Sequence, residues 1–382
     1  MAAPVIRRVE WLELFFDLAF VAFITQLATG LHGAPGAAQF LVFITWSIPA
    51  WWAWTNVMVG VNLLPTLPPR RLGLALLVAM GFVGLMAASV TEDASRAWAF
   101  SLACAGLRLL LMTLWTYRAK MFGHALWRPL VYNGTTSLIW IASAFVPAPW
   151  DFALWAVAIV GEIWLMRVSN STLTADVRVD AAHASERLGL FMIILMGESV
   201  VTLVVSLGKH WDPASGIVAL IGFVAICGLA WGFFMFGTNA MEQGLERMSA
   251  TRDFRGLLQT TMILPYLLVV GVTVLAAGLS TAVSSPAAPL PFGAALSLGG
   301  GVTLFYLTNT IVSIRWGESW RRLLPWAVPG VLLPLVILLF GQLSATISLA
   351  CIAALVLAIT VRATVAERSR SRAARTNSQP VP

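Results

Sequence analysis

Five ionisable residues lie inside stretches that are otherwise apolar, and they are the strongest candidates for chemistry. These residues are Glu13, Asp17, Arg108, Glu162 and Glu198. A charge at the centre of a bilayer costs about 2.5–3.5 kcal/mol on insertion scales, so such residues pair, face a cavity or carry a proton. Because one arginine cannot neutralise all the deep acids, the set predicts a buried acidic site that binds a cation or relays protons. The alternative is that Arg108 pairs with one acid and the set holds helices together.

The two acids nearest the N-terminus are spaced for one helix face. Glu13 and Asp17 are four residues apart, and residues at that spacing are neighbours on an α-helix. At 1.5 Å per residue, Asp17 lies about 6 Å deeper than Glu13, which could instead sit among lipid headgroups. We expect Asp17 and Glu198 to form the titrating or cation-binding pair, with Arg108 as the counter-charge.

Weaker signals come from a histidine and from the tryptophans. His183 and Glu186 could offer two metal ligands on one helical turn, but the sequence supplies no third ligand, so the start of a cytoplasmic helix is the favoured interpretation. Trp54 belongs to a tryptophan-rich stretch that could form an aromatic cage for a cation. Membrane-interface belts and helix packing are the more ordinary explanation of such tryptophans.

No enzyme signature occurs in the sequence, so we predict neither an enzyme nor a cofactor or metal. The three cysteines lie singly in apolar runs, which is typical of small buried hydrophobic residues. Ser199, beside Glu198, is the only obvious nucleophile for an intramembrane enzyme acting on lipid, and a packing role suits it better. Gly299–Gly301 lie within an apolar run and predict close helix packing.

The composition requires a membrane around these residues. Hydrophobic residues make up 59% of the 382 residues and charged residues 11%, with a mean hydropathy of +0.84. A soluble domain carries about 25% charged residues, so this chain needs a bilayer as its solvent. The net charge of +7 sits between apolar runs, where basic residues orient a membrane protein, and no nucleic-acid module occurs.

The sequence predicts an all-α, polytopic bundle of about twelve transmembrane helices. The expected spans are roughly Trp11–Leu31, Gln39–Asn62, Leu72–Thr91, Ala97–Tyr117, Leu130–Val146, Trp150–Met166, Leu188–Leu207, Ala214–Phe236, Leu257–Ser280, Phe292–Ile314, Leu323–Phe340 and Ala345–Val361. With this assignment, 21 of the 24 basic residues, Arg187 among them, fall on the side of the N-terminus. The positive-inside rule therefore predicts that both termini are cytoplasmic.

Two pairs of similar segments predict an internal duplication. The segment from Glu10 to Phe15 resembles that from Glu186 to Phe191, and the segment that holds Trp54 and Asn62 resembles the one that holds Trp231 and Asn239. The chain is thus expected to form two parallel six-helix repeats, residues 1–168 and 188–365. A cytoplasmic link at 169–187 joins them, and a disordered basic cytoplasmic tail follows at 366–382. Parallel repeats are common in transporters, with the substrate site between the halves.

The sequence resembles the bacterial low temperature requirement A (LtrA) family. The resemblance is carried by Glu13–Val21 (ELFFDLAFV), by Glu186–Ser199 (ERLGLFMIILMGES) with His183 upstream, and by the segments Trp46–Asn62 and Leu264–Gly271. It covers nearly the whole chain before the tail and implies a protein of the bacterial cytoplasmic (inner) membrane, linked by name to growth in the cold. Family members often carry acids just before the arginine that corresponds to Arg70, whereas this chain has none between Asn62 and Arg70.

Three functions follow from these observations. A secondary transporter or proton- or cation-coupled carrier fits the repeat and the deep acids best, and its partners would be the lipid bilayer and protons, small cations or solutes. A membrane scaffold or a stress- or cold-related sensor without transport is the second interpretation. An intramembrane lipid-modifying enzyme is the third.

Overall fold

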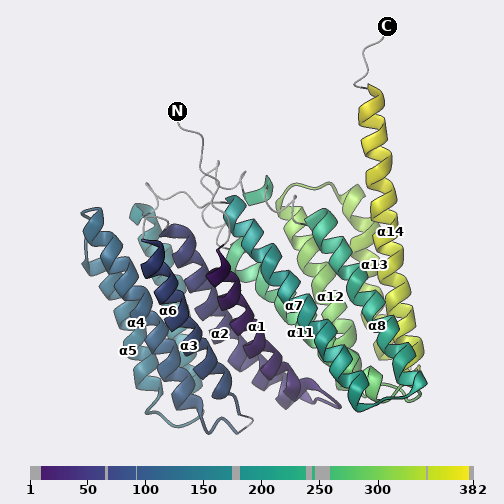
Figure 1. Cartoon of the computed structure of the whole chain (residues 1–382), viewed down its shortest axis with the longest axis horizontal. Helices are drawn as coiled ribbons and strands as arrows, with labels where there is room; N and C mark the ends of the chain where they lie inside the picture. The colour runs from purple at the N-terminus through teal and green to yellow at the C-terminus, as the bar shows by residue number, and fades with distance from the viewer. Residues whose placement is uncertain are drawn as a thin grey trace. The chain divides into compact units, whose positions relative to one another are not determined.

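The described residues of the computed structural model form mainly α-helices (Figure 1). It describes residues 10–64, 68–91, 93–173, 181–237, 243–245, 259–340 and 343–377. The chain forms two compact units. Unit 1 comprises Met1–Gly30, Gly36–Ile194 and Leu245–Tyr266, and unit 2 comprises Leu31–Pro35, Leu195–Gly244 and Leu267–Pro382. The main boundary between these units falls after Ile194, inside a helix. The division expected at the link 169–187 stays a prediction.

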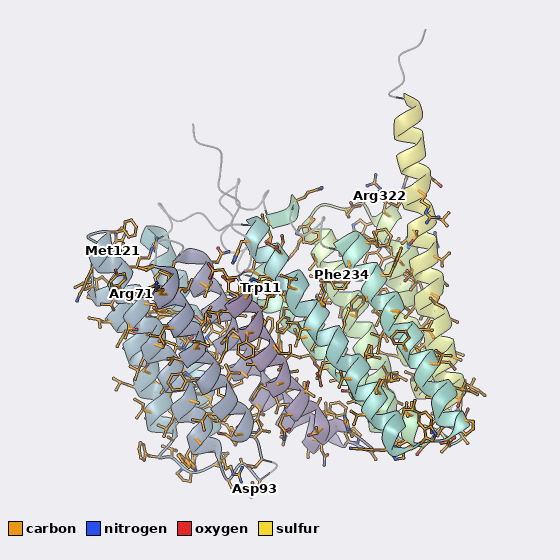
Figure 2. The ribbon with its side chains drawn as sticks, viewed as in Figure 1. Trp11, Arg71, Asp93, Met121, Phe234 and Arg322 are labelled. Carbon is orange, nitrogen blue, oxygen red and sulfur yellow. The ribbon has the colours of Figure 1, made fainter. Side chains whose placement is uncertain are left out.

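Unit 1 is a bundle organised around its second helix. Its helices are α1 (Trp11–Ala28), α2 (Ala37–Leu63), α3 (Pro69–Ala88), α4 (Ala97–Met121), α5 (Trp127–Ser143), α6 (Trp150–Leu173), the first part of α7 (Ala181–Lys209) and the π-helical turn η3 (Gln259–Ile263). Helix α2 packs against α1, α3, α4 and α6. Arg71 and Met121 lie at one end of this unit and Asp93 lies at the other, so α3 and α4 run antiparallel (Figure 2).

Unit 2 contains the remainder of α7 and the C-terminal helices. These are α8 (Pro213–Gly232), the π-helical turn η2 (Phe233–Gly237), most of α11 (Leu264–Ser284), α12 (Phe292–Arg315), α13 (Trp320–Phe340) and α14 (Ala345–Asn377). The 3-10 turn η1 (Thr29–Leu31) ends at Leu31, the first residue of unit 2. Helix α14 packs on α8 and α13 and extends past both at its C-terminal end (Figure 1). It continues to Asn377, beyond the point where a disordered tail was expected to begin.

Nine segments of the described chain are long and apolar enough to cross a bilayer. The sequence predicted twelve, and the segments of α2, α5 and α6 are not among the nine. Large apolar side chains such as Trp11, Phe145 and Trp211 are more than 80% exposed, whereas the acids of α1 are buried. Apolar exposure outside and polar burial inside is the arrangement that lipid requires. The twelve-span count and the parallel repeat stay predictions.

Glycines of α12 bring this helix into close contact with two others of unit 2, α11 and α13, as the sequence predicted for Gly299–Gly301. A Cβ atom on Gly301 would lie 2.5 Å from the carbonyl oxygen of Gly271 on α11, and one on Gly299 would lie 2.9 Å from the carbonyl oxygen of Pro334 on α13. Gly300, between them, would meet only Leu296 of its own helix. Small residues that let backbones approach are typical of helix contacts in membranes.

One helix of unit 2 begins with a well-formed cap. The Asp212 carboxylate accepts hydrogen bonds from the backbone N–H groups of Ala214 and Ser215 and from the Ser215 hydroxyl, and Pro213 occupies the first turn of α8. These hydrogen bonds, those of Ser215 first, lower the pKa of the Asp212 carboxyl below its ordinary 3.8.

Candidate functional site

Both acids of α1 point into the core of unit 1. The side chains of Glu13 and Asp17 are 0% exposed. Their spacing of four residues places them on one helix face, as the sequence predicted. Glu13 is therefore enclosed by protein, and its depth in the bilayer stays a prediction.

The counter-charge of these acids is Arg187 on α7, a residue that the sequence placed at the end of the expected cytoplasmic link 169–187. Arg187 Nη2 lies 3.1 Å from Asp17 Oδ1, Arg187 Nε donates to Asp17 Oδ2 at 3.4 Å, and Arg187 Nη1 lies 3.5 Å from Glu13 Oε2. The side chain of Arg187 is 1% exposed. Helix α7 begins at Ala181, before the span predicted from Leu188, and its first turns carry this arginine into the bundle.

A histidine one turn before Arg187 completes the contact between α1 and α7. His183 Nε2 lies 3.1 Å from Glu13 Oε2, and the imidazole is 1% exposed. His183 and Arg187 are four residues apart, so α7 presents two nitrogen groups at the spacing with which α1 presents two carboxylates. This matched i, i+4 spacing of opposite charge types was the signal in the sequence that could have identified Arg187.

The other imidazole nitrogen faces an amide at the end of α2. Asn62 Nδ2 lies 3.2 Å from His183 Nδ1, and both side chains are buried. When the amide nitrogen donates to Nδ1, the ring is neutral and carries its proton on Nε2, facing Glu13. When the amide is turned, its oxygen accepts from a protonated Nδ1, so Asn62 can serve the neutral and the charged imidazole alike.

An aromatic shell encloses the Asp17 side of the cluster. Trp54 Nε1 donates to Asp17 Oδ1 at 2.8 Å, and the guanidinium carbon of Arg187 lies 5.9 Å from the centre of the Trp54 ring. The ring of Trp54 stacks on Trp51 at 4.7 Å and contacts Phe191 at the same distance. Such a shell excludes water, so the charges beside it interact strongly.

The cluster joins two acids of α1 to two nitrogen-bearing side chains of α7. Glu13 and Asp17 are carboxyl groups, Arg187 is a guanidinium group and His183 is an imidazole. Ionisable groups are costly in a buried site unless they pair, and these four side chains pair with one another across the contact between α1 and α7.

A second buried ion pair joins α4, α6 and α2 elsewhere in unit 1. Arg108 Nη2 and the indole Nε1 of Trp52 both donate to the same oxygen, Oε2, of Glu162. Arg108 is 3% exposed and Glu162 is fully buried. Arg108 is therefore the counter-charge of Glu162, and the formal charges of these two residues sum to zero.

The remaining candidates make none of the contacts of these two groups or fall outside the described residues. Glu198 lies further along α7, in unit 2, and is only partly buried. Trp231 is half-exposed and donates to the Thr364 hydroxyl at 3.2 Å. Glu186 is exposed while His183 is buried, so the two do not converge on one site. Asn239 falls outside the described residues.

Within the part of the chain that the structure describes, no group of three or more His, Cys, Asp or Glu side chains is arranged to hold a metal ion.

Comparison with known proteins gives one family. The family described as bacterial low temperature requirement A protein (LtrA) matches residues 8–366. An uncharacterized protein of Rhizobium meliloti (strain 1021) is 27% identical over 338 residues, which is 82% of this chain and 78% of that protein. No solved structure matches.

Proposed function

We propose that this membrane protein, which belongs to the bacterial low temperature requirement A (LtrA) family, is a proton-coupled carrier of the bacterial cytoplasmic membrane. Glu13, Asp17, His183 and Arg187 form its proton-binding site. The observation that carries the proposal is the buried contact itself, in which two carboxyl groups of α1 meet an arginine and an imidazole of α7, with the imidazole 3.1 Å from Glu13.

Proton binding changes how firmly α1 and α7 hold together. With a proton on the imidazole, His183 pairs with Glu13 and Arg187 pairs with Asp17. Without that proton, Arg187 is shared between both acids, and the electrostatic attraction between α1 and α7 is weaker. The protonation state therefore biases two arrangements of α1 against α7, which is what a proton-coupled carrier requires.

The roles differ in one respect from those suggested by the sequence. Arg187 replaces Arg108 as the counter-charge of Asp17, because Arg108 is engaged with Glu162. Glu198 stays a candidate for a further titrating group. Cytoplasmic termini are part of the proposal, and reporter fusions at both ends would test them.

Proton flux in proteoliposomes tests the proposal. A pH-sensitive dye inside the vesicles would report flux after an imposed pH gradient, for the wild type and for Asp17→Asn, Glu13→Gln and His183→Gln. We expect each substitution to reduce the flux at least tenfold while the protein stays folded. Glu186→Gln is the matched control, because Glu186 lies on the same helix and is exposed.

The outcomes separate the functions. Wild-type flux in all three folded variants would refute the assignment of the site. No flux from folded wild-type protein under a pH gradient, with or without added cations, would refute the carrier and favour the scaffold or sensor.

A further inference from the structure

The ion pair of Arg108 and Glu162 uses only half of its hydrogen-bonding groups. Arg108 Nη2 and Trp52 Nε1 converge on Glu162 Oε2. Among the described residues, the other carboxylate oxygen, Oε1, and the other guanidinium nitrogen, Nη1, have no hydrogen-bond partner. Both side chains are at least 97% buried. A buried charged group that lacks a partner for one of its atoms costs stability, so a site of this kind calls for a further polar group.

A tyrosine hydroxyl on α5 shares this condition. Tyr132 Oη is buried and has no hydrogen-bond partner within the described chain. It lies close enough to Glu162 and Arg108 to interact electrostatically with both. The Thr136 hydroxyl, one turn further along α5, lies within hydrogen-bonding reach of the same carboxylate. Its single proton is directed to the backbone carbonyls of Tyr132 and Asn133, so it does not serve the unused oxygen of Glu162. Helix α5 thus adds a third unsatisfied polar atom to the site.

We propose that unit 1 holds one bound water molecule between α4, α5 and α6, bonded to Arg108 Nη1, Glu162 Oε1 and Tyr132 Oη. Arg108 Nη1 is bonded to the same carbon as Nη2, and Glu162 Oε1 to the same carbon as Oε2. The two unused atoms therefore flank the contact between Nη2 and Oε2, and a single water can bridge them. The guanidinium nitrogen donates, the carboxylate oxygen accepts and the hydroxyl does either. This set matches the three hydrogen bonds that a buried water typically makes.

The charge of the site selects a neutral ligand. Arg108 and Glu162 sum to zero, so an ion bound beside them would bring an uncompensated charge into the protein interior. The bound water also makes Tyr132 a positioning residue for the pair, since its hydroxyl orients the molecule that holds the unused guanidinium nitrogen and carboxylate oxygen. This site does not depend on the proposed carrier function, because it uses none of the residues of the cluster between α1 and α7.

An experimental structure in nanodiscs, at a resolution that shows internal waters, tests the proposal directly. We expect density for one water within about 2.7–3.2 Å of Arg108 Nη1, Glu162 Oε1 and Tyr132 Oη. Density at these atoms that is larger than one water would overturn the assignment to water. No density there, when other internal waters are visible, would overturn the site itself.

Tyr132→Phe supplies a second readout. If its hydroxyl bonds to a bound water, its removal lowers the apparent melting temperature by about 2–4 °C, the shift expected from one lost hydrogen bond. Tyr117→Phe is the matched control, since Tyr117 is only partly buried and is expected to leave the melting temperature unchanged. An unchanged or higher melting temperature in Tyr132→Phe would count against the site, because removing an unbonded buried hydroxyl relieves a cost.

Discussion

Replacing Arg187 by glutamine removes the counter-charge of the buried acids without shortening the side chain greatly. Two unit charges 4 Å apart interact by about 4 kcal/mol at an effective dielectric constant of about 20. Arg187 has nitrogen atoms within 3.1–3.5 Å of both Asp17 and Glu13, and all three side chains are at most 1% exposed. Breaking a buried pair by removing one partner costs about 3–5 kcal/mol. We therefore expect Arg187→Gln to lower the free energy of unfolding by that amount.

The assay is reversible unfolding in mixed micelles, followed by tryptophan fluorescence. Arg70→Gln is the control, because Arg70 is exposed and a surface substitution changes stability by about 0.5 kcal/mol or less. Adding Asp17→Asn to Arg187→Gln removes the acid left without its partner, so the double variant is expected to recover part of the loss. Equal stabilities of Arg187→Gln and Arg70→Gln would refute the ion-pair account of this cluster.

Three further substitutions test separate parts of the structure. Trp54→Phe removes an indole donor from the buried carboxylate of Asp17 and is expected to lower the free energy of unfolding by about 1.5–3 kcal/mol. Trp231→Phe, at the corresponding position of the expected repeat, removes only a half-exposed hydrogen bond and should lower it by less than about 1 kcal/mol. Equal losses in the two variants would contradict this account. Gly301→Ala places a Cβ 2.5 Å from a backbone oxygen of α11 and should destabilise by about 1–3 kcal/mol in thermal melts, while Gly300→Ala should be neutral or stabilising. Hydrogen bonds lower the folded-state pKa of the Asp212 carboxyl. The ionised carboxylate therefore stabilises the protein above the unfolded-state pKa near 3.8, and this stabilisation is lost as the pH falls below that value. Asp212→Asn should flatten the decrease in stability at acid pH, and an unchanged decrease would argue against the cap.

The helices and the buried acids could be predicted because both depend on local sequence. Apolar runs of about 20 residues mark membrane helices, and the four-residue spacing of Glu13 and Asp17 fixes their common face. The end of α14 was harder to place, since its arginines indicate solvent exposure without indicating where the helix stops. Alanine and arginine are good helix formers, which accounts for a helix that continues past Val365 to Asn377.

The partners of the acids could not be predicted, because they depend on how helices distant in sequence pack. The positive-inside rule treats an arginine next to an apolar run as a surface charge, whereas the Arg187 side chain is buried and pairs with Asp17. The tryptophans posed a similar problem, since burial against an acid and exposure at an interface have the same sequence signature. Trp52 and Trp54 lie on different faces of α2, and their indole groups reach two different acids, Glu162 and Asp17.

Charge movement on a solid-supported membrane tests the central claim most directly. A pH jump applied to proteoliposomes that contain the wild-type protein should produce a current, because protons enter the cluster between α1 and α7. The same jump should produce no current with His183→Gln/Glu13→Gln, which removes the two groups placed to share the proton, and an undiminished one with Glu186→Gln. A wild-type current that persists in the folded double variant would contradict the account, as would folded wild-type protein that gives no current at any pH step.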